Sequence, residues 1–166
     1  MCPVIPGRTA LVTGAMAALG TVALGGAAQA NCAPPYATLF ACDIPERNAR
    51  VEFCEIRDDR PHPGRGDHSY NYSVGAAPAE LYFEADGYYF STKYMDSGDT
   101  VGVGLKHGNY VYAFYVTGKY LERVDSAQIQ VFDSVDAFQS DAKEVEVERR
   151  YCAPGSIILN WDTIAP

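Results

Sequence analysis

The sequence predicts a small all-β domain, a single antiparallel sandwich or barrel of about 8 to 10 short strands. After residue 31, short runs rich in Tyr, Phe and Val alternate with groups of Gly, Pro, Asp and Asn, which is typical of strands and turns. Several runs also alternate apolar and polar residues, as Val51 and Phe53 do with Glu52 and Cys54. Such strands bury one face and expose the other to solvent.

The first thirty residues have the pattern of a cleavable signal peptide. Arg8 is their only charged residue, an apolar stretch runs from Thr9 to Ala27, and Ala28-Gln29-Ala30 forms a small-x-small cleavage site. The stretch consists mainly of Ala, Gly and Thr, whereas a membrane anchor would be rich in Leu and Ile. We expect residues 1–30 to be removed and residues 31–166 to form one exported domain, periplasmic or secreted by a bacterium, with no transmembrane segment.

The strands are predicted from these patterns in chain order. They are Tyr36 to Cys42, Arg50 to Ile56, Ser69 to Val74, Glu80 to Glu84, Tyr88 to Met95, Thr100 to Leu105, Tyr110 to Val116, Ala127 to Phe132, Glu144 to Cys152 and Ser156 to Trp161. In the ninth strand, Val145 and Val147 are expected to face the core and the intervening glutamates to face solvent.

The connections between the strands are predicted from their turn residues. Asp86-Gly87 and Thr117-Gly118-Lys119 are compact turns, so Glu80 to Met95 and Tyr110 to Val124 should each form a hairpin. A single short helix is predicted from Ser134, its N-cap, to Ala142. The segment from Arg57 to His68 is polar and contains two prolines and two glycines, which indicates an exposed loop.

Loss of the signal peptide leaves four cysteines in an oxidising compartment, which predicts two disulfides. Of the three possible pairings, we favour Cys42 with Cys54 and Cys32 with Cys152. The first two cysteines lie on neighbouring predicted strands that flank the polar turn from Pro45 to Arg50. The second pair would join the start of the mature chain to its end. A zinc site is disfavoured because the sequence has neither a CxxC motif nor a Cys-His cluster.

The mature chain is strongly acidic. Without Arg8 it has 12 basic and 21 acidic residues, a net charge of −9. Such a charge disfavours nucleic acid and anionic lipid as partners and favours a cationic protein. The alternative interpretation is that the acidic surface only keeps the protein soluble.

Catalytic chemistry has little support in the sequence. There is no GxSxG motif, the cysteines are expected to be bonded, and no cofactor motif is predicted. The weak candidates for a metal site are His62, Asp67 and His68, whose imidazole and carboxylate groups suit zinc or copper. A loop rich in proline and glycine provides no rigid ligand geometry, so solvated histidines are the competing interpretation.

Tyrosine is the most informative residue type in the middle of the chain, where Tyr70 to Tyr120 includes ten of the 12 tyrosines. Tyrosine suits contacts with proteins and sugars, so we select Tyr88, Tyr110 and Tyr112 as binding candidates. A cationic protein or a cell-wall saccharide would be the partner. The competing interpretation is that these residues only reflect the preference of strands for tyrosine.

Two resemblances accompany these patterns. Leu39-Phe40-Ala41-Cys42, Cys54, Tyr70-Asn71-Tyr72-Ser73-Val74-Gly75 and Pro78-Ala79-Glu80-Leu81 resemble a layout found in small exported bacterial β-rich proteins of uncharacterised function, which implies the fold and no activity. Ser97-Gly98 is similar to the start of the Ser-Gly-x-x-Tyr loop of bacterial inhibitors of C-type lysozyme, although Val101 stands where those proteins have tyrosine. That resemblance implies a disulfide-bonded β-barrel that blocks a cationic enzyme, and it adds Ser97 and Gly98 to the binding candidates.

Together these features predict a non-enzymatic exported binding module, with inhibition of a cationic hydrolase such as lysozyme as its specific form. One alternative is a small metal-dependent or hydrolytic enzyme with its site on the loop of His62 and His68. Another is a structural protein of the cell envelope.

Overall fold

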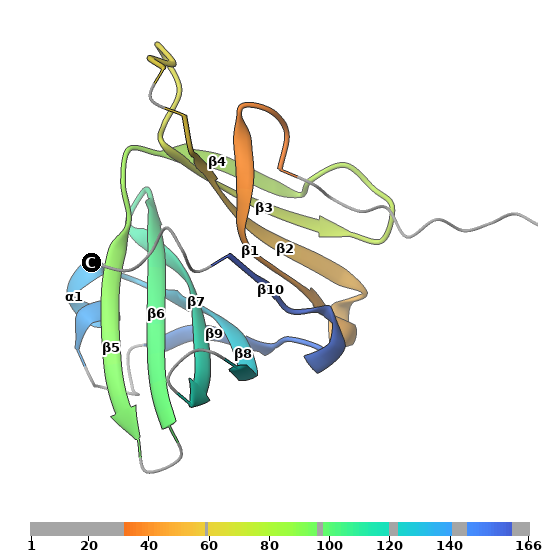
Figure 1. The fold of residues 1–166 in the computed structure, drawn as a ribbon, viewed down its shortest axis with the longest axis vertical. Coiled ribbons are helices and arrows are strands. Elements are labelled where there is room, and N and C mark those ends of the chain that lie inside the picture. Colours follow the sequence, from red (N-terminus) through yellow and green to blue (C-terminus); the bar gives the residue numbers. More distant parts are fainter. Residues whose placement is uncertain (1–31, 59, 96–97, 120–122, 141–145, 161–166) are drawn as a thin grey trace, which may run out of the picture.

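A computed structural model describes residues 32–58, 60–95, 98–119, 123–140 and 146–160 (Figure 1). Within these ranges the protein is all-β, as predicted, and its strands form two antiparallel sheets of five strands each. The strand order is β10-β1-β2-β3-β4 in the first sheet and β5-β6-β7-β8-β9 in the second. The predicted signal peptide lies outside the described residues.

Each segment predicted from the sequence contains a strand, although Ser156 of the tenth segment belongs to a 3₁₀ helix and Trp161 lies outside the described residues. The first sheet contains β1 (Tyr36–Ile44), β2 (Ala49–Ile56), β3 (His68–Val74), β4 (Leu81–Ala85) and β10 (Ile158–Leu159). The second contains β5 (Tyr89–Met95), β6 (Gly98–His107), β7 (Tyr110–Lys119), β8 (Arg123–Phe132) and β9 (Glu146–Tyr151). Two short 3₁₀ helices, η1 (Pro45–Arg47) and η3 (Pro154–Ser156), connect strands, and the segment between Ile56 and His68 contains neither helix nor strand, as predicted.

The two sheets pack face to face around an aromatic centre. The ring of Phe114 on β7 stacks on Phe40 of β1 with centroids 4.3 Å apart, and its other neighbour Phe53 of β2 lies edge-on at 4.9 Å. All three rings are fully buried. Edge-to-face and stacked rings at these separations add to the stabilisation from burial of their apolar area. The core therefore joins strands that are more than 60 residues apart in the chain, as Phe53 and Phe114 are.

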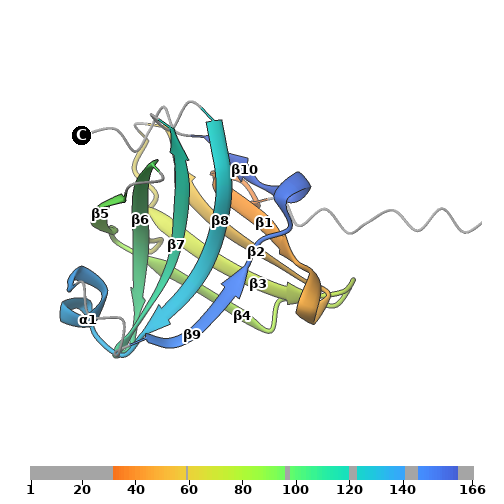
Figure 2. The same ribbon diagram turned by 90° about the horizontal axis from the view of Figure 1, so that it is seen from below.

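The outer face of the second sheet carries a smaller core. In β6 the valines Val101 and Val103 point toward the first sheet, while Gly102 and Gly104 occupy the opposite face. A Cβ atom at Gly104 would lie 2.6 Å from Cγ1 of Val111 and 3.3 Å from the ring of Phe138, so only glycine fits there. Phe138 lies on the helix α1 (Val135–Gln139), which packs against this outer face (Figure 2).

Helix α1 begins where the sequence predicts. The side-chain oxygen of Ser134 accepts a hydrogen bond of 3.1 Å from the backbone N–H of Ala137, which is the geometry of an N-cap. The helix ends at Gln139, and the last predicted residue, Ala142, lies outside the described residues.

One of the two predicted hairpins is wrong. Strand β4 pairs with β3 at the edge of the first sheet, and β5 pairs with β6 at the edge of the second, so Asp86-Gly87 is a crossing between sheets. A two-residue Asp-Gly hairpin needs positive φ at both central residues, and neither Asp86 nor Gly87 has it. The predicted hairpin of β7 and β8 is confirmed, but Thr117-Gly118-Lys119 continues β7 with an irregularity at Gly118, so these residues are not the turn.

The sequence prediction also missed a hairpin. Strands β6 and β7 are joined by Gly108-Asn109, and Gly108 has a φ of +60°. A two-residue loop with glycine at the first central position is a recognised hairpin signal.

The favoured disulfide pairing is wrong, although the prediction of two disulfides is confirmed. Cys32 is bonded to Cys54 with their Cα atoms 5.8 Å apart, and Cys42 is bonded to Cys152 with theirs 5.6 Å apart. Cys42 lies opposite Val51 and faces the core, whereas Cys54 follows the buried Phe53 and points to the outer face of the same sheet. Side chains on opposite faces of a sheet are too far apart for a bridge.

Two predicted solvent-facing patterns are also wrong. Glu52 points away from the core, as predicted, yet only 1% of its surface is exposed. On β9, Val147 is 58% exposed, while Glu148 and Arg150 face the space between the sheets. The reason is Cys152, whose bond to Cys42 sets the inward face at the end of this strand, and period-two alternation then turns Arg150 and Glu148 inward. Val145 lies outside the described residues.

No helix among the described residues is long and apolar enough to cross a membrane.

Candidate ligand-binding pocket

A pocket of about 320 Å³ opens between the two sheets, beside the aromatic core. Its size is at the lower end of the range of roughly 300–1,000 Å³ found for small-ligand sites. The first sheet and its connections contribute Ile44, Arg47, Val51, Tyr70, Tyr72, Glu80 and Leu81, and the second contributes Tyr112, Ile129, Val131, Glu148 and Arg150. Aliphatic and aromatic side chains thus form the walls, and the charged side chains come from η1, from β9 and from the segment before β4.

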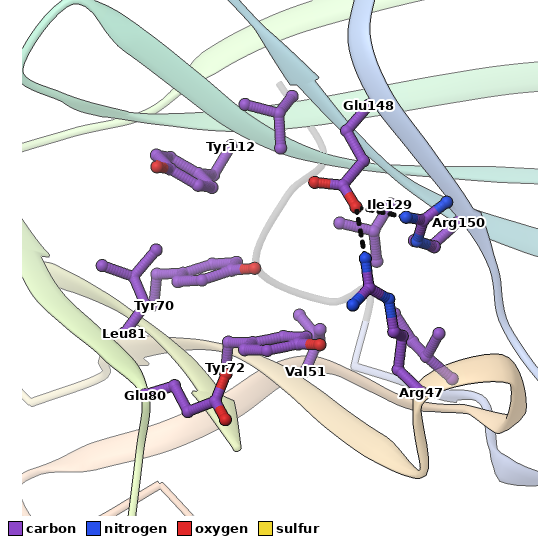
Figure 3. Close-up of a pocket in the computed structure, with 12 residues that line it drawn as sticks. Arg47, Val51, Tyr70, Tyr72, Glu80, Leu81, Tyr112, Ile129, Glu148 and Arg150 are labelled. Atoms are coloured by element: carbon purple, nitrogen blue, oxygen red, sulfur yellow. Dashed lines mark ion pairs between the residues drawn. The ribbon is translucent and has the colours of Figure 1, made fainter. Parts of the chain in front are cut away.

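Three tyrosines line one side of the pocket (Figure 3). Tyr70 and Tyr72 are two residues apart on β3, so both point to the inner face of the sheet, and Tyr112 faces them from β7. The Tyr70 ring is held by Phe53 at 5.1 Å, by Phe83 at 5.1 Å and by Tyr112 at 5.2 Å. These contacts fix the direction of the Tyr70 hydroxyl, which Figure 3 shows pointing into the cavity.

The side chain of Tyr70 is buried, and its hydroxyl opens onto the cavity without a protein partner among the described residues. Only 3% of the surface of the residue is exposed, and within the described part of the chain no hydrogen bond is made by its oxygen. Burial raises the pKa of Tyr70 well above its usual range, and the neighbouring Tyr112 and Tyr72 and the charge of Glu148 act in the same direction. The group therefore remains a protonated donor at neutral pH.

An ion cluster occupies the opposite side of the pocket (Figure 3). Arg150 on β9 contacts an oxygen of Glu148 at 2.6 Å, and Arg47 of η1 reaches the same oxygen at 3.8 Å. The Nε atom of Arg150 is buried and has no hydrogen-bond partner among the described residues. Two guanidinium groups therefore share one carboxylate. Glu80, the other acid of the pocket, lies on the far side of Tyr72 in Figure 3.

The five predicted binding residues do not form one site. Tyr112 lines the pocket, while Tyr88 and Tyr110 are exposed near the same end of the second sheet. Gly98 begins β6 at the opposite end of the sheet, and Ser97 lies outside the described residues. The tyrosines whose side chains the structure describes neither form one patch nor all pack in the core.

The predicted metal candidates are not brought together. Nε2 of His62 lies 2.6 Å from Oδ1 of Asp58, which also accepts from Arg60 through its other oxygen, and these hydrogen bonds hold the pKa of Asp58 at about 2. The ring of His68 packs edge-on against Tyr88 at 5.2 Å, and burial lowers its pKa. Within the ranges that the structure describes, these histidines and Asp67 do not share a set of ligand atoms close enough for one ion.

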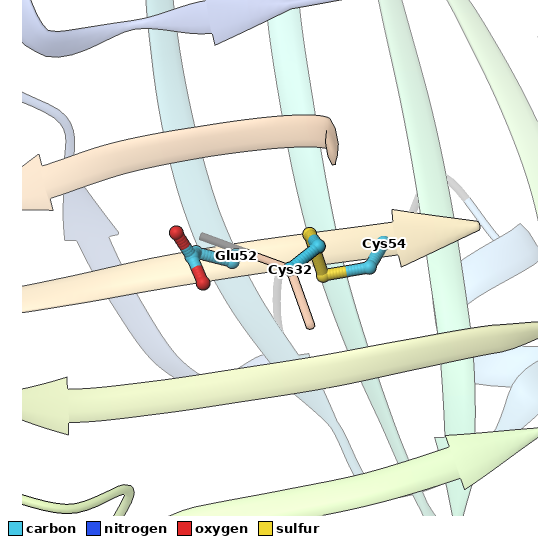
Figure 4. A group of neighbouring side chains, drawn as sticks. All are labelled: Cys32, Glu52 and Cys54. Atoms are coloured by element: carbon cyan, nitrogen blue, oxygen red, sulfur yellow. A yellow bond between two sulfur atoms is a disulfide. The ribbon is translucent and has the colours of Figure 1, made fainter. Parts of the chain in front are cut away.

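The group of potential ligands that does lie close together is Cys32, Glu52 and Cys54 on the outer face of β2 (Figure 4). The two sulfur atoms are bonded to each other, so they are not free to bind a metal. Glu52 accepts hydrogen bonds of 3.3 Å from Nε of Arg50 and from Nδ2 of Asn71. Burial raises the pKa of Glu52, and the hydrogen bonds oppose this shift. The group is a structural anchor of the N-terminal segment.

Of the twelve residues that line the pocket, only Tyr112 was among the binding residues predicted from the sequence. For Glu148 and Arg150 a partial signal was present, because these residues alternate with Cys152 on one face of a strand. To use this signal, one must know that Cys152 faces inward. Arg47 has no such signal, because its position depends on the turn that η1 forms between β1 and β2.

Comparisons with protein-family models, with curated proteins and with solved structures find no match. The chemistry of the pocket is therefore the basis for assigning a function.

Proposed function

We propose that this protein is an exported, non-enzymatic binding module that holds a small ligand in the pocket between its sheets. The observation that carries the proposal is the Tyr70 hydroxyl, a donor on a buried side chain that faces the cavity without a protein partner among the described residues. A ligand that accepts a hydrogen bond from this hydroxyl replaces water there, and the net contribution of such a bond is about 0.5–1.5 kcal/mol.

The construction of the walls supports a binding role. The lining residues Val51, Tyr112 and Ile129 belong to regular strands, and strands hold side chains more rigidly than loops do. The bond between Cys42 and Cys152 connects the two sheets that form the pocket. Two disulfides also support export, since such bonds persist mainly outside the cytoplasm.

A neutral aromatic probe tests whether the pocket takes up a ligand. Methyl-labelled mature protein is titrated with 4-methylphenol while NMR follows the methyl groups of Leu81, Ile129 and Val131. We expect saturable shifts confined to these pocket methyl groups. Leu81→Trp places a larger ring in the cavity and should weaken binding at least tenfold.

Tyr82→Trp is the matched control, because Tyr82 is the next residue on β4 and is exposed. It should bind the probe as the unchanged protein does. A probe concentration of 10 mM detects binding free energies of about 4 kcal/mol or better. If the pocket methyl groups do not shift at this concentration, the proposal is wrong. It is also wrong if Leu81→Trp binds the probe as tightly as the unchanged protein does.

A second candidate function is inhibition of a cationic hydrolase such as lysozyme. The net charge of −9 for residues 31–166 supports it, because opposite charge accelerates association with a basic protein. Tyr88 and Tyr110, which are 42% and 46% exposed, would provide contacts. The test is lysozyme activity at low salt with excess mature protein. Unchanged activity would eliminate this candidate and would leave the small-ligand proposal intact.

A further inference from the structure

We propose that the ligand of the pocket is a small organic carboxylate with an apolar body. The carboxylate would lie against Arg47, Arg150 and the Tyr70 hydroxyl, and the apolar body would lie along Tyr72, Tyr112 and Leu81. This inference rests on the proposed function, because it names the class of ligand that the same pocket selects.

The polar side of the pocket has more positive charge than negative. Arg47 and Arg150 both form ion pairs with Glu148, and the pair with Arg47 is long, at 3.8 Å. More than half of the Arg47 side chain is exposed, so this guanidinium is able to turn toward a ligand. An added anion would give each arginine a carboxylate, which is the pairing that guanidinium groups favour geometrically.

The hydrogen-bond donors on this side also exceed the acceptors. The Tyr70 hydroxyl and the Arg150 Nε–H have no partner among the described residues, and Glu148 is the acidic side chain that faces them. A carboxylate offers two oxygen atoms with about four acceptor positions and no donor. Such a group is therefore able to accept from the Tyr70 hydroxyl and from the exposed guanidinium of Arg47.

The remaining walls require an apolar body. Val51, Leu81 and Ile129 are aliphatic, and the rings of Tyr72 and Tyr112 present flat faces to the cavity. The volume of about 320 Å³ limits the ligand to a small molecule and excludes a folded partner.

Other ligand classes fit less well. A cation beside the Tyr70 hydroxyl would approach two arginines that share Glu148, because Glu80, the second acid of the pocket, lies on the far side of Tyr72. Like charges repel strongly where water is partly excluded. A purely apolar ligand would remove water from the Tyr70 hydroxyl and from Arg150 without replacing its hydrogen bonds.

Three probes with the same ring and chain length distinguish these classes. Isothermal titration calorimetry of the mature protein compares 3-phenylpropionate, 3-phenylpropanamide and 3-phenylpropylamine. We expect the carboxylate to bind at least tenfold more tightly than the amide and the amine to bind most weakly. Added salt should weaken the binding of the carboxylate more than that of the amide.

Variants assign the preference to the arginines. Arg47→Gln and Arg150→Gln should each weaken 3-phenylpropionate at least fivefold and change 3-phenylpropanamide less than twofold. Glu148→Gln should strengthen 3-phenylpropionate at least threefold, because it removes the competing carboxylate, whereas a merely structural role of Glu148 predicts weaker binding. Arg123→Gln is the control, since Arg123 lies at the start of β8 with 88% of its side chain exposed.

Equal or tighter binding of the amide or the amine would overturn the inference, as would weaker carboxylate binding by folded Glu148→Gln. In either case the pocket methyl shifts with 4-methylphenol would still support the proposed function. If 4-methylphenol does not shift the pocket methyl groups, the proposed function fails, and this inference, which rests on it, fails with it.

Discussion

The space between the two sheets has two regions that are built from similar rings but behave differently. Around Phe40, Phe53 and Phe114 the rings are in mutual contact and fully buried. Around Tyr70, Tyr72 and Tyr112 the rings are larger and polar, and they border a cavity. The phenylalanine region therefore supplies stability, whereas the tyrosine region places hydroxyl groups beside a cavity and forms part of the candidate site. Tyr70 belongs to both regions, since its ring touches Phe53 and its hydroxyl faces the cavity.

Breaking the disulfides should have the largest effect and should distinguish the interior from the outer face. Cys42 and Cys152 belong to the inter-sheet core and are 110 residues apart, whereas Cys32 and Cys54 are 22 apart on the outer face. The chain-entropy estimate is about 5 kcal/mol for a loop of roughly 100 residues and about 3 kcal/mol for one of roughly 20. We therefore expect Cys42→Ala with Cys152→Ala to lower the free energy of unfolding more than Cys32→Ala with Cys54→Ala does. Urea denaturation of both double variants measures the difference, and the reverse order would contradict this assignment.

Truncation of one ring in each region tests the comparison directly. Phe114→Ala should lower the free energy of unfolding by about 3–5 kcal/mol, because it leaves a cavity between two sheets. Tyr72→Ala should lower it by roughly 1–2 kcal/mol, because its ring already borders open space. The two losses are compared by thermal and urea unfolding. Equal losses would mean that the tyrosine region is as tightly packed as the phenylalanine region.

The Tyr70 hydroxyl should affect stability at alkaline pH. Because the folded-state pKa of Tyr70 is raised above its unfolded value of about 10, the unfolded chain loses this proton first as the pH rises. The stability of the unchanged protein should therefore fall above about pH 10, in part through this residue. Tyr70→Phe keeps the ring contacts and should make that decline shallower. Identical declines of the free energy of unfolding between pH 9 and 11 would show that the hydroxyl is not buried as described.

The smallest expected effect on stability is that of Glu52→Gln. Glu52 lies on the outer face of the first sheet, so this variant is a reference for the two regions between the sheets. Burial raises its folded-state pKa, so the contribution of this group to stability falls as the pH rises from the unfolded value of about 4.3 through the folded value. From pH 4 to pH 7, the stability of Glu52→Gln should therefore increase relative to that of the unchanged protein, which means a larger free energy of unfolding. Urea titrations at the two pH values measure it. A change in the opposite direction would mean that the hydrogen bonds from Arg50 and Asn71 outweigh burial.

The local elements were predictable because their causes are local. Strand segments, the Ser134 cap and the loop after Ile56 follow from alternation, side-chain capping and turn composition, which need only neighbouring residues. Relations between distant segments were predicted less well. The Asp86-Gly87 crossing resembles a hairpin turn in the sequence, and only its φ angles and the pairing of β4 with β3 show that the chain changes sheets there.

The disulfide error and the missed half of the pocket have a common origin. Alternation places Phe53 and Cys54 on opposite faces of β2, which already disfavours a bond from Cys54 to a cysteine in the core. The packing of the two sheets decides that Cys42 faces the core and that Cys152 meets it there. Once this bond is known, the inward positions of Arg150 and Glu148 follow.

By itself, the sequence determined that the chain is built of short antiparallel strands with two disulfides, because alternation, turn residues and an even cysteine count act over short distances. The tertiary structure alone decided which cysteines meet, where the chain passes between sheets, and which tyrosines border a cavity. These depend on contacts between residues such as Cys42 and Cys152, which are 110 positions apart. No local pattern specifies such contacts, since they result from the packing of two complete sheets.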